Sequence, residues 1–199
     1  MEHRRPTVAG TLAGRTAELF SAACHNRVRH LVIWAYPPPL MMETVMTPRL
    51  NEPFKLAQAP IKAMQALEVA LAASGLDHNL LELVKLRASQ INGCAFCIHM
   101  HTTDLRKHGE SEMRLYMLNA WRESTLYSPR ERAALAWTEA LTRLAETGAP
   151  DADYDLVKAE FTDAEQVNLT LAIGAINVWN RLQVGFRAAH PQEDIVDAA

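Results

Sequence analysis

The sequence predicts an all-α protein, and three observations lead to that prediction. Apolar residues recur at spacings of three and four along most of the chain after residue 47. Helix-start signals, such as Ser or Thr followed three residues later by Glu, and helix-end glycines separate these stretches. No stretch alternates apolar and polar residues convincingly as a strand would, so we expect a helical bundle.

The predicted helices each begin at a capping residue, a proline or the end of a turn. In chain order they start at Pro60, Asp77, the cysteine pair after Asn92-Gly93, Ser111, Ser128, Asp151 and Thr162. Ser74-Gly75 ends the first, and the helix of the cysteine pair runs to His108, with Gly109 as its left-handed cap. The helix from Ser128 is expected to continue to Gly148 and the last one to Phe186.

The last predicted helix is apolar on most of its faces. It also carries polar residues, namely Asn168, Asn177, Asn180 and Arg181, which argue against a membrane span. A helix of this kind must be covered on most sides, either by the domain core or by another subunit. We therefore expect a homo-oligomer.

Residues 1–45 differ from the rest of the chain. They contain arginine but no lysine, and the run Pro37-Pro38-Pro39 closes an apolar patch too short for a signal-peptide core or a membrane span. We interpret them as a poorly packed, disordered extension or a start site assigned too far upstream; the alternative is an ordered helix on an oligomer surface. Residues 46–199 are then the helical domain, and Cys24 is a bystander.

The composition limits the function. With 199 residues and 49% hydrophobic residues, the chain can bury one core. A formal net charge of -3 gives no electrostatic reason to expect nucleic acid as a partner. Three cysteines are too few for a secreted disulfide scaffold, so we expect a cytoplasmic protein with a catalytic or metal-binding pair.

The stretch from Glu82 to His101 holds the residues whose spacing implies chemistry. Cys94 and Cys97 form a C-x-x-C pair directly after a turn signal, which predicts that the pair lies at a helix N-terminus, where thiolates are stabilised. Cys97 and His101 are four apart and share a helix face, so the imidazole can accept the thiol proton. Helix positions three apart lie about 5 Å from each other, which permits a Cys94–Cys97 disulfide.

Each of these residues has a structural alternative. The cysteines could be buried apolar residues or half of a metal site, although no second C-x-x-C or H-x3-H supplies further ligands. His101 could be an ordinary polar helix residue, and Glu82 a solvated charge near Lys85 and Arg87. No flavin or nicotinamide fingerprint is present, so we expect no cofactor and an external reductant.

Glu82, the C-x-x-C pair and His101 together resemble the AhpD family of alkylhydroperoxidases, in the carboxymuconolactone decarboxylase-like superfamily. The likeness extends over residues 47–191. It implies an AhpD-like helical bundle that assembles as trimers or hexamers. It also implies a peroxidase of organic hydroperoxides or hydrogen peroxide, with Cys97 as peroxidatic thiol, Cys94 as resolving thiol, His101 and Glu82 as a proton relay, and a lipoyl or thioredoxin-like dithiol protein as reductant.

The sequence departs from the archetypal family pattern at Phe96, where a histidine precedes the second cysteine. His99 lies on a different helix face from Cys97 and does not replace it. The departure leaves a general thiol–disulfide oxidoreductase as the alternative function. A non-enzymatic, redox-sensing helical oligomer is the third, and a decarboxylase is disfavoured because such members do not depend on a cysteine pair.

Overall fold

The computed structural model describes residues 47–191, and every regular element within that range is helical. This confirms the predicted all-α class. The elements are α1 (Pro53–Leu56), α2 (Gln58–Ala72), α3 (His78–Asn92), α4 (Ala95–Lys107), α5 (Glu112–Met117), the short 3-10 helix η1 (Leu118–Ala120), α6 (Pro129–Thr142), α7 (Leu144–Thr147), α8 (Asp151–Glu160) and α9 (Asp163–Phe186). The expected extension at residues 1–45, with Cys24, lies outside the described residues.

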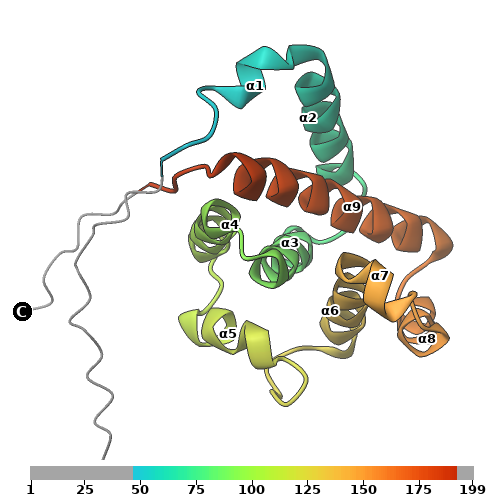
Figure 1. Cartoon of the computed structure of the whole chain (residues 1–199). Coiled ribbons are helices and arrows are strands. Elements are labelled where there is room, and N and C mark those ends of the chain that lie inside the picture. The colour runs from blue at the N-terminus through green and yellow to red at the C-terminus, as the bar shows by residue number, and fades with distance from the viewer. Residues whose placement is uncertain (1–46, 192–199) are drawn as a thin grey trace, which may run out of the picture. The chain divides into compact units, whose positions relative to one another are not determined.

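Helix α3 is the centre of the bundle. It packs against α4, α6 and α9, and α9 also contacts α2, α4, α6 and α8. Figure 1 shows α9 crossing the molecule, with α1 and α2 on one side of it and the other helices on the opposite side. The helix that holds Glu82 is therefore supported by α4, α6, α9 and the short helix η1.

Two clusters of buried apolar residues form the core, and α3 contributes to both. One joins α3 to α2, α6, α8 and α9, with Leu81, Val84 and Ile173 among its members. The other joins α3 to α4, η1 and α6 through residues such as Leu86 and Leu105. Because each buried leucine is worth about 1.5–3 kcal/mol, these contacts hold α3 and α4 in a fixed relation.

The predicted caps are present at most helix starts. Asp77, Ser111, Ser128 and Thr162 each accept a hydrogen bond from a backbone N–H three residues later. Two boundaries differ from the prediction. Helix α2 begins at Gln58 instead of Pro60, and the helix from Ser128 breaks at Arg143 instead of running to Gly148. The Thr147 hydroxyl donates to the Ala140 carbonyl at 2.7 Å. This carbonyl, in the last turn of α6, is thus bonded by a side chain from beyond the break.

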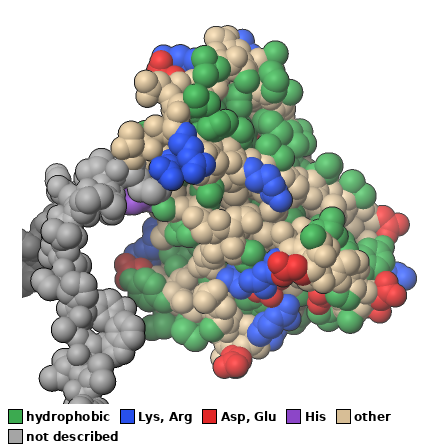
Figure 2. All heavy atoms as spheres, in the orientation of Figure 1, with side chains coloured by type: hydrophobic (Ala, Val, Ile, Leu, Met, Phe, Trp, Pro, Cys, Tyr) green, Lys and Arg blue, Asp and Glu red, His purple; other side chains and the backbone are tan. Residues whose placement is uncertain are grey.

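Helix α2 is apolar but weakly buried. Ile61 and Leu71 are its buried residues, and Val69 is 72% exposed. Figure 2 shows hydrophobic side chains gathered over this upper part of the molecule, where α1 and α2 lie. Within residues 47–191, no helix has the length and apolar character needed to cross a membrane.

Candidate active site

The cysteine pair lies at the tight junction between α3 and α4. Gly93 ends α3 in the left-handed conformation, with φ of 64°, which a glycine adopts without strain. The Cys94 N–H then donates to the Ser89 carbonyl at 3.0 Å. Cys94 is the N-cap of α4, and its sulfur accepts a hydrogen bond from the Cys97 N–H at 3.4 Å. The predicted position of the pair at a helix N-terminus is confirmed.

Both thiols are free and buried, and their pKa values are shifted in opposite directions. The hydrogen bond from the Cys97 thiol outweighs the effect of burial and, with the Cys97 N–H, lowers the pKa of Cys94 to about 7. The same hydrogen bond, burial and the charge of Cys94 raise the pKa of Cys97. Of the two thiols, the one with the lowered pKa is thus Cys94, which holds the N-cap position.

Glu82 and His101 form a buried hydrogen-bonded pair across the α3–α4 contact. The His101 Nδ1–H donates to the Glu82 carboxylate at 2.6 Å. Burial alone would raise the pKa of Glu82, but the His101 hydrogen bond and the charges of His101 and Lys85 outweigh it and lower the pKa to about 2. The other ring nitrogen, His101 Nε2, is buried and has no hydrogen-bond partner. Such an atom is unusual and available for proton transfer.

A row of charges extends from this pair to α2. Lys85 Nζ contacts Glu82 at 3.1 Å and Glu68 of α2 at 3.0 Å. The indole N–H of Trp179 in α9 donates to the other oxygen of Glu68 at 3.0 Å. Burial lowers the pKa of Lys85, but the charges of Glu82 and Glu68 outweigh it and raise the pKa. The lysine therefore remains cationic between the two carboxylates.

A cavity of ≈ 700 Å³ opens onto the pair. Its wall includes Cys97 and His101 together with Glu82 and Lys85, whereas Cys94 does not line it. Much of the remaining wall is apolar: Phe54, Phe96, Met100, Ile176 and Trp179. Cys97 and His101 thus face the same space. The sequence predicted that His101 accepts the Cys97 proton directly, but His101 Nε2 makes no hydrogen bond to the thiol. A molecule bound between them would have to carry the proton.

Sequence reasoning missed a group of amides behind the thiols. Asn180 is 1% exposed, donates to the Ser89 hydroxyl at 3.0 Å and accepts from Asn92 at 2.8 Å. Its side chain helps to lower the pKa of Cys94 and opposes the larger effects that raise the pKa of Cys97. The signal was an asparagine inside a long apolar helix, because a buried amide needs partners.

The described residues thus combine an all-helical bundle with a buried C-x-x-C pair, a histidine–carboxylate pair and a shared cavity. The family model of the carboxymuconolactone decarboxylase family matches residues 58–140. YdfG of Bacillus subtilis, an uncharacterized protein, is 43% identical over 138 residues, which cover 68% of this chain and 94% of YdfG. The chain therefore belongs to the carboxymuconolactone decarboxylase family, among its AhpD-like members.

Two further relatives place the chain near AhpD. A crystal structure from Agrobacterium tumefaciens, of a protein of unknown function suggested to be an antioxidant defence protein AhpD, matches with a TM-score of 0.71 and 49% identity. The match covers 74% of this chain and 100% of that one. Alkyl hydroperoxide reductase AhpD of Maricaulis maris is 51% identical over 39 residues, 20% of this chain and 22% of the reductase.

Proposed function

We propose that this protein is a thiol-dependent peroxidase that reduces hydroperoxides through Cys97 and Cys94. The names of its relatives suggest an antioxidant, peroxidase-related role. The observation that supports the proposal most directly is the shared cavity. Cys97 lines it beside His101, whose unpartnered Nε2 is held in place by Glu82. A nucleophile and a positioned acid–base group facing one space are what peroxide cleavage requires.

The first step uses one thiolate and one proton. The first proton to leave the reduced pair comes from Cys94, whose pKa is about 7, while the same hydrogen bond raises the pKa of Cys97. Transfer of the Cys97 proton to the Cys94 sulfur gives the Cys97 thiolate, the sulfur that faces the cavity. This thiolate attacks the terminal oxygen of the hydroperoxide and the O–O bond breaks, which leaves a sulfenic acid on Cys97. His101 takes up a proton from solvent at its unpartnered Nε2 and passes it to the departing alkoxide, which leaves as the alcohol.

The second step resolves the sulfenic acid. The Cys94 thiol attacks the Cys97 sulfur, water leaves, and a disulfide forms, so that the dithiol has supplied two electrons to the peroxide. An external dithiol protein of the lipoyl or thioredoxin-like kind then reduces the disulfide by exchange.

The cavity wall favours an organic hydroperoxide over hydrogen peroxide. Phe54, Phe96 and Trp179 supply aromatic surface, and Phe54 and Trp179 contact each other edge to face, with ring centroids 5.8 Å apart. Burial of an apolar group on such surface contributes about 25 cal/mol per Å². Phe96, which replaces the family histidine, therefore adds apolar surface at the site where an acid–base group is lost.

Two serine variants test the assigned roles, both made with Cys24→Ser so that one candidate thiol remains in each. Cys97→Ser should not react with cumene hydroperoxide. Cys94→Ser should react once, and more slowly, because the sulfur that takes the Cys97 proton is gone and His101 is the remaining base. It should then stall as a Cys97 sulfenic acid, which dimedone traps and intact-mass spectrometry detects. A dimedone adduct on Cys94 in the Cys97→Ser protein, with none on Cys97 in the other variant, would reverse the assignment.

One observation favours a second candidate, a general thiol–disulfide oxidoreductase. The low pKa of Cys94, about 7, is typical of an attacking thiol in disulfide exchange. In that case Cys94→Ser would abolish reduction of a small disulfide substrate, and the wild-type protein would consume no hydroperoxide in the presence of a dithiol. Peroxide consumption by the wild-type protein therefore separates the two functions.

We also propose a homo-oligomer, a trimer or hexamer. Large apolar side chains are exposed on two helices, with Val69 of α2 at 72% and Val167 of α9 at 59%. A contact between copies would remove this surface from water. Light scattering should give a mass of several chains, and a stable monomer at micromolar concentration would exclude the proposal.

A further inference from the structure

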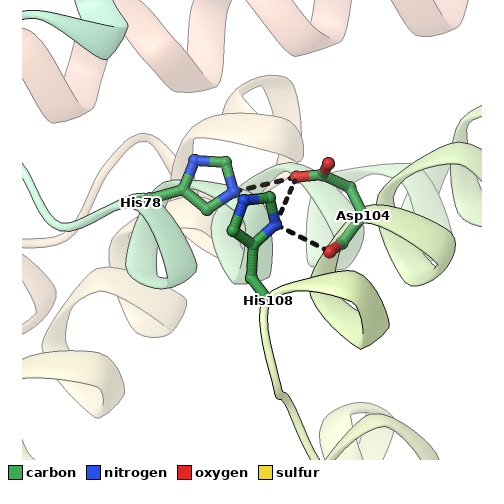
Figure 3. Close-up of side chains that lie close together, drawn as sticks. All are labelled: His78, Asp104 and His108. Atoms are coloured by element: carbon green, nitrogen blue, oxygen red, sulfur yellow. Dashed lines mark hydrogen bonds and ion pairs between the residues drawn. The ribbon is translucent and has the colours of Figure 1, made fainter.

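A second cluster of functional side chains lies apart from the thiols, where the start of α3 meets the end of α4. His78 is the first residue of α3, Asp104 lies in the last turns of α4, and His108 caps α4. Figure 3 shows both imidazole rings turned toward the Asp104 carboxylate. One ligand atom from each residue lies within 4.8 Å of the others. None of the proposed peroxidase steps uses these residues.

The cluster is already organised by hydrogen bonds. His78 Nε2 lies 2.8 Å from Asp104 Oδ2, and His108 Nδ1 lies 3.6 Å from the same oxygen. His108 Nδ1–H also donates to the Asp104 backbone carbonyl at 2.9 Å. The two rings contact each other, with centroids 4.1 Å apart. Both imidazoles thus surround one carboxylate oxygen, and a cation bound there would exchange these hydrogen bonds for metal–ligand bonds.

We propose that His78, Asp104 and His108 form a binding site for a divalent transition cation of the zinc type. Two imidazoles and one carboxylate are ligands that Zn²⁺, Co²⁺ and Ni²⁺ accept, whereas Mg²⁺ and Ca²⁺ prefer oxygen ligands alone. Asp104 and His108 are four apart on one helix, so their side chains lie on the same face. The three side chains are 37% to 51% exposed, which leaves room for water in the remaining coordination positions.

The position of the site gives it a structural consequence. It joins the first residue of α3 to the last turn and cap of α4, the two helices that hold Glu82 and His101 together. The C-terminal end of the α4 dipole favours a cation, whereas the N-terminal end of the α3 dipole disfavours one. Because these two effects oppose each other, the affinity depends on the three ligands. A bound cation would stabilise the pairing of these helices. Asp104 also borders the ≈ 700 Å³ cavity, so the site lies at its rim.

Zinc binding to matched variants of the full-length chain tests the proposal. The parent carries Cys94→Ser and Cys97→Ser, so that the candidate thiols cannot bind the metal. Equilibrium dialysis should show one Zn²⁺ fewer per chain in both His78→Ala and Asp104→Asn, with affinity at this site at least about ten-fold weaker. Thermal unfolding of the parent should shift upward with Zn²⁺, and this shift should disappear in both variants.

His99→Ala is the matched control, because His99 also lies on α4 but outside the cluster. It should retain both the binding and the thermal shift of the parent. Circular dichroism in the absence of metal checks that each variant is folded. If folded His78→Ala and Asp104→Asn bind as much Zn²⁺ as the parent, with the same thermal shift, the site does not exist. That result would leave the thiol proposal untouched.

Discussion

The ionisation of the thiol pair offers a quantitative test of the site. The pKa of Cys94 is lowered from 9.0 to about 7, and each unit corresponds to 1.36 kcal/mol, so its surroundings stabilise the thiolate by about 3 kcal/mol. The Cys97 thiol is the largest contributor. In Cys97→Ala the backbone N–H of residue 97 remains but the thiol donor is lost. We expect the pKa of Cys94 to rise by about one unit or more in this variant.

Ultraviolet absorbance of the thiolate, followed against pH in a Cys24→Ser background, measures this ionisation. The parent should show one thiolate forming near pH 7, since the folded pKa of Cys94 is about 7. Cys94→Ala should show none there, because burial continues to raise the pKa of the remaining Cys97. The reasoning fails if the ionisation near neutral pH survives in Cys94→Ala and is lost in Cys97→Ala, since the N-cap thiol would then not be the acidic one.

Three further predictions concern groups around the thiols. Glu82 has a folded pKa of about 2 against an ordinary 4.5, so its stabilisation is complete above pH 4.5 and is lost as the pH falls toward 2. In urea unfolding, Glu82→Gln should flatten this acid dependence by up to about 3 kcal/mol; an unchanged slope would contradict the paired carboxylate. Asn180→Ala should cost about 1–3 kcal/mol of stability and raise the pKa of Cys94, both absent if the amide only fills space. Phe54→Ala should reduce kcat/KM for cumene hydroperoxide about ten-fold while changing that for hydrogen peroxide less; equal losses would exclude the aromatic wall as a specificity element.

Local signals predicted most of the fold. Capping residues and the spacing of apolar positions act within a few residues of one another, so the starts at Asp77, Ser128 and Thr162 could be read from the sequence. The break at Arg143 could not, because no glycine or proline marks it, and the Thr147 hydroxyl that bonds the Ala140 carbonyl acts only in the folded chain. Boundaries of this kind depend on tertiary contacts.

In the candidate site, too, local signals predicted some features and tertiary contacts set the others. The placement of Cys94 and Cys97 at a helix start followed from the turn at Gly93, which lies next to them in sequence. The apolar cavity wall and the contact of Asn180 with Asn92 join residues far apart in the chain, so no local pattern indicated them. The lowered pKa of Cys94 was not predicted, because the sequence argument rested on the four-residue offset between Cys97 and His101 and not on the N-cap geometry of Cys94.

The row of charges from Glu82 through Lys85 to Glu68 joins a weakly packed helix to the chemistry of the site. Lys85 divides its charge between one carboxylate on the fixed helix α3 and one on α2, whose apolar surface is largely exposed. A displacement of α2 would withdraw Glu68 and leave Lys85 to Glu82 alone, which changes how strongly that carboxylate holds the His101 proton. A contact made by α2 would then alter the rate of proton delivery without moving either sulfur. Glu68 is thus the residue through which a change at α2 would reach the acid–base pair.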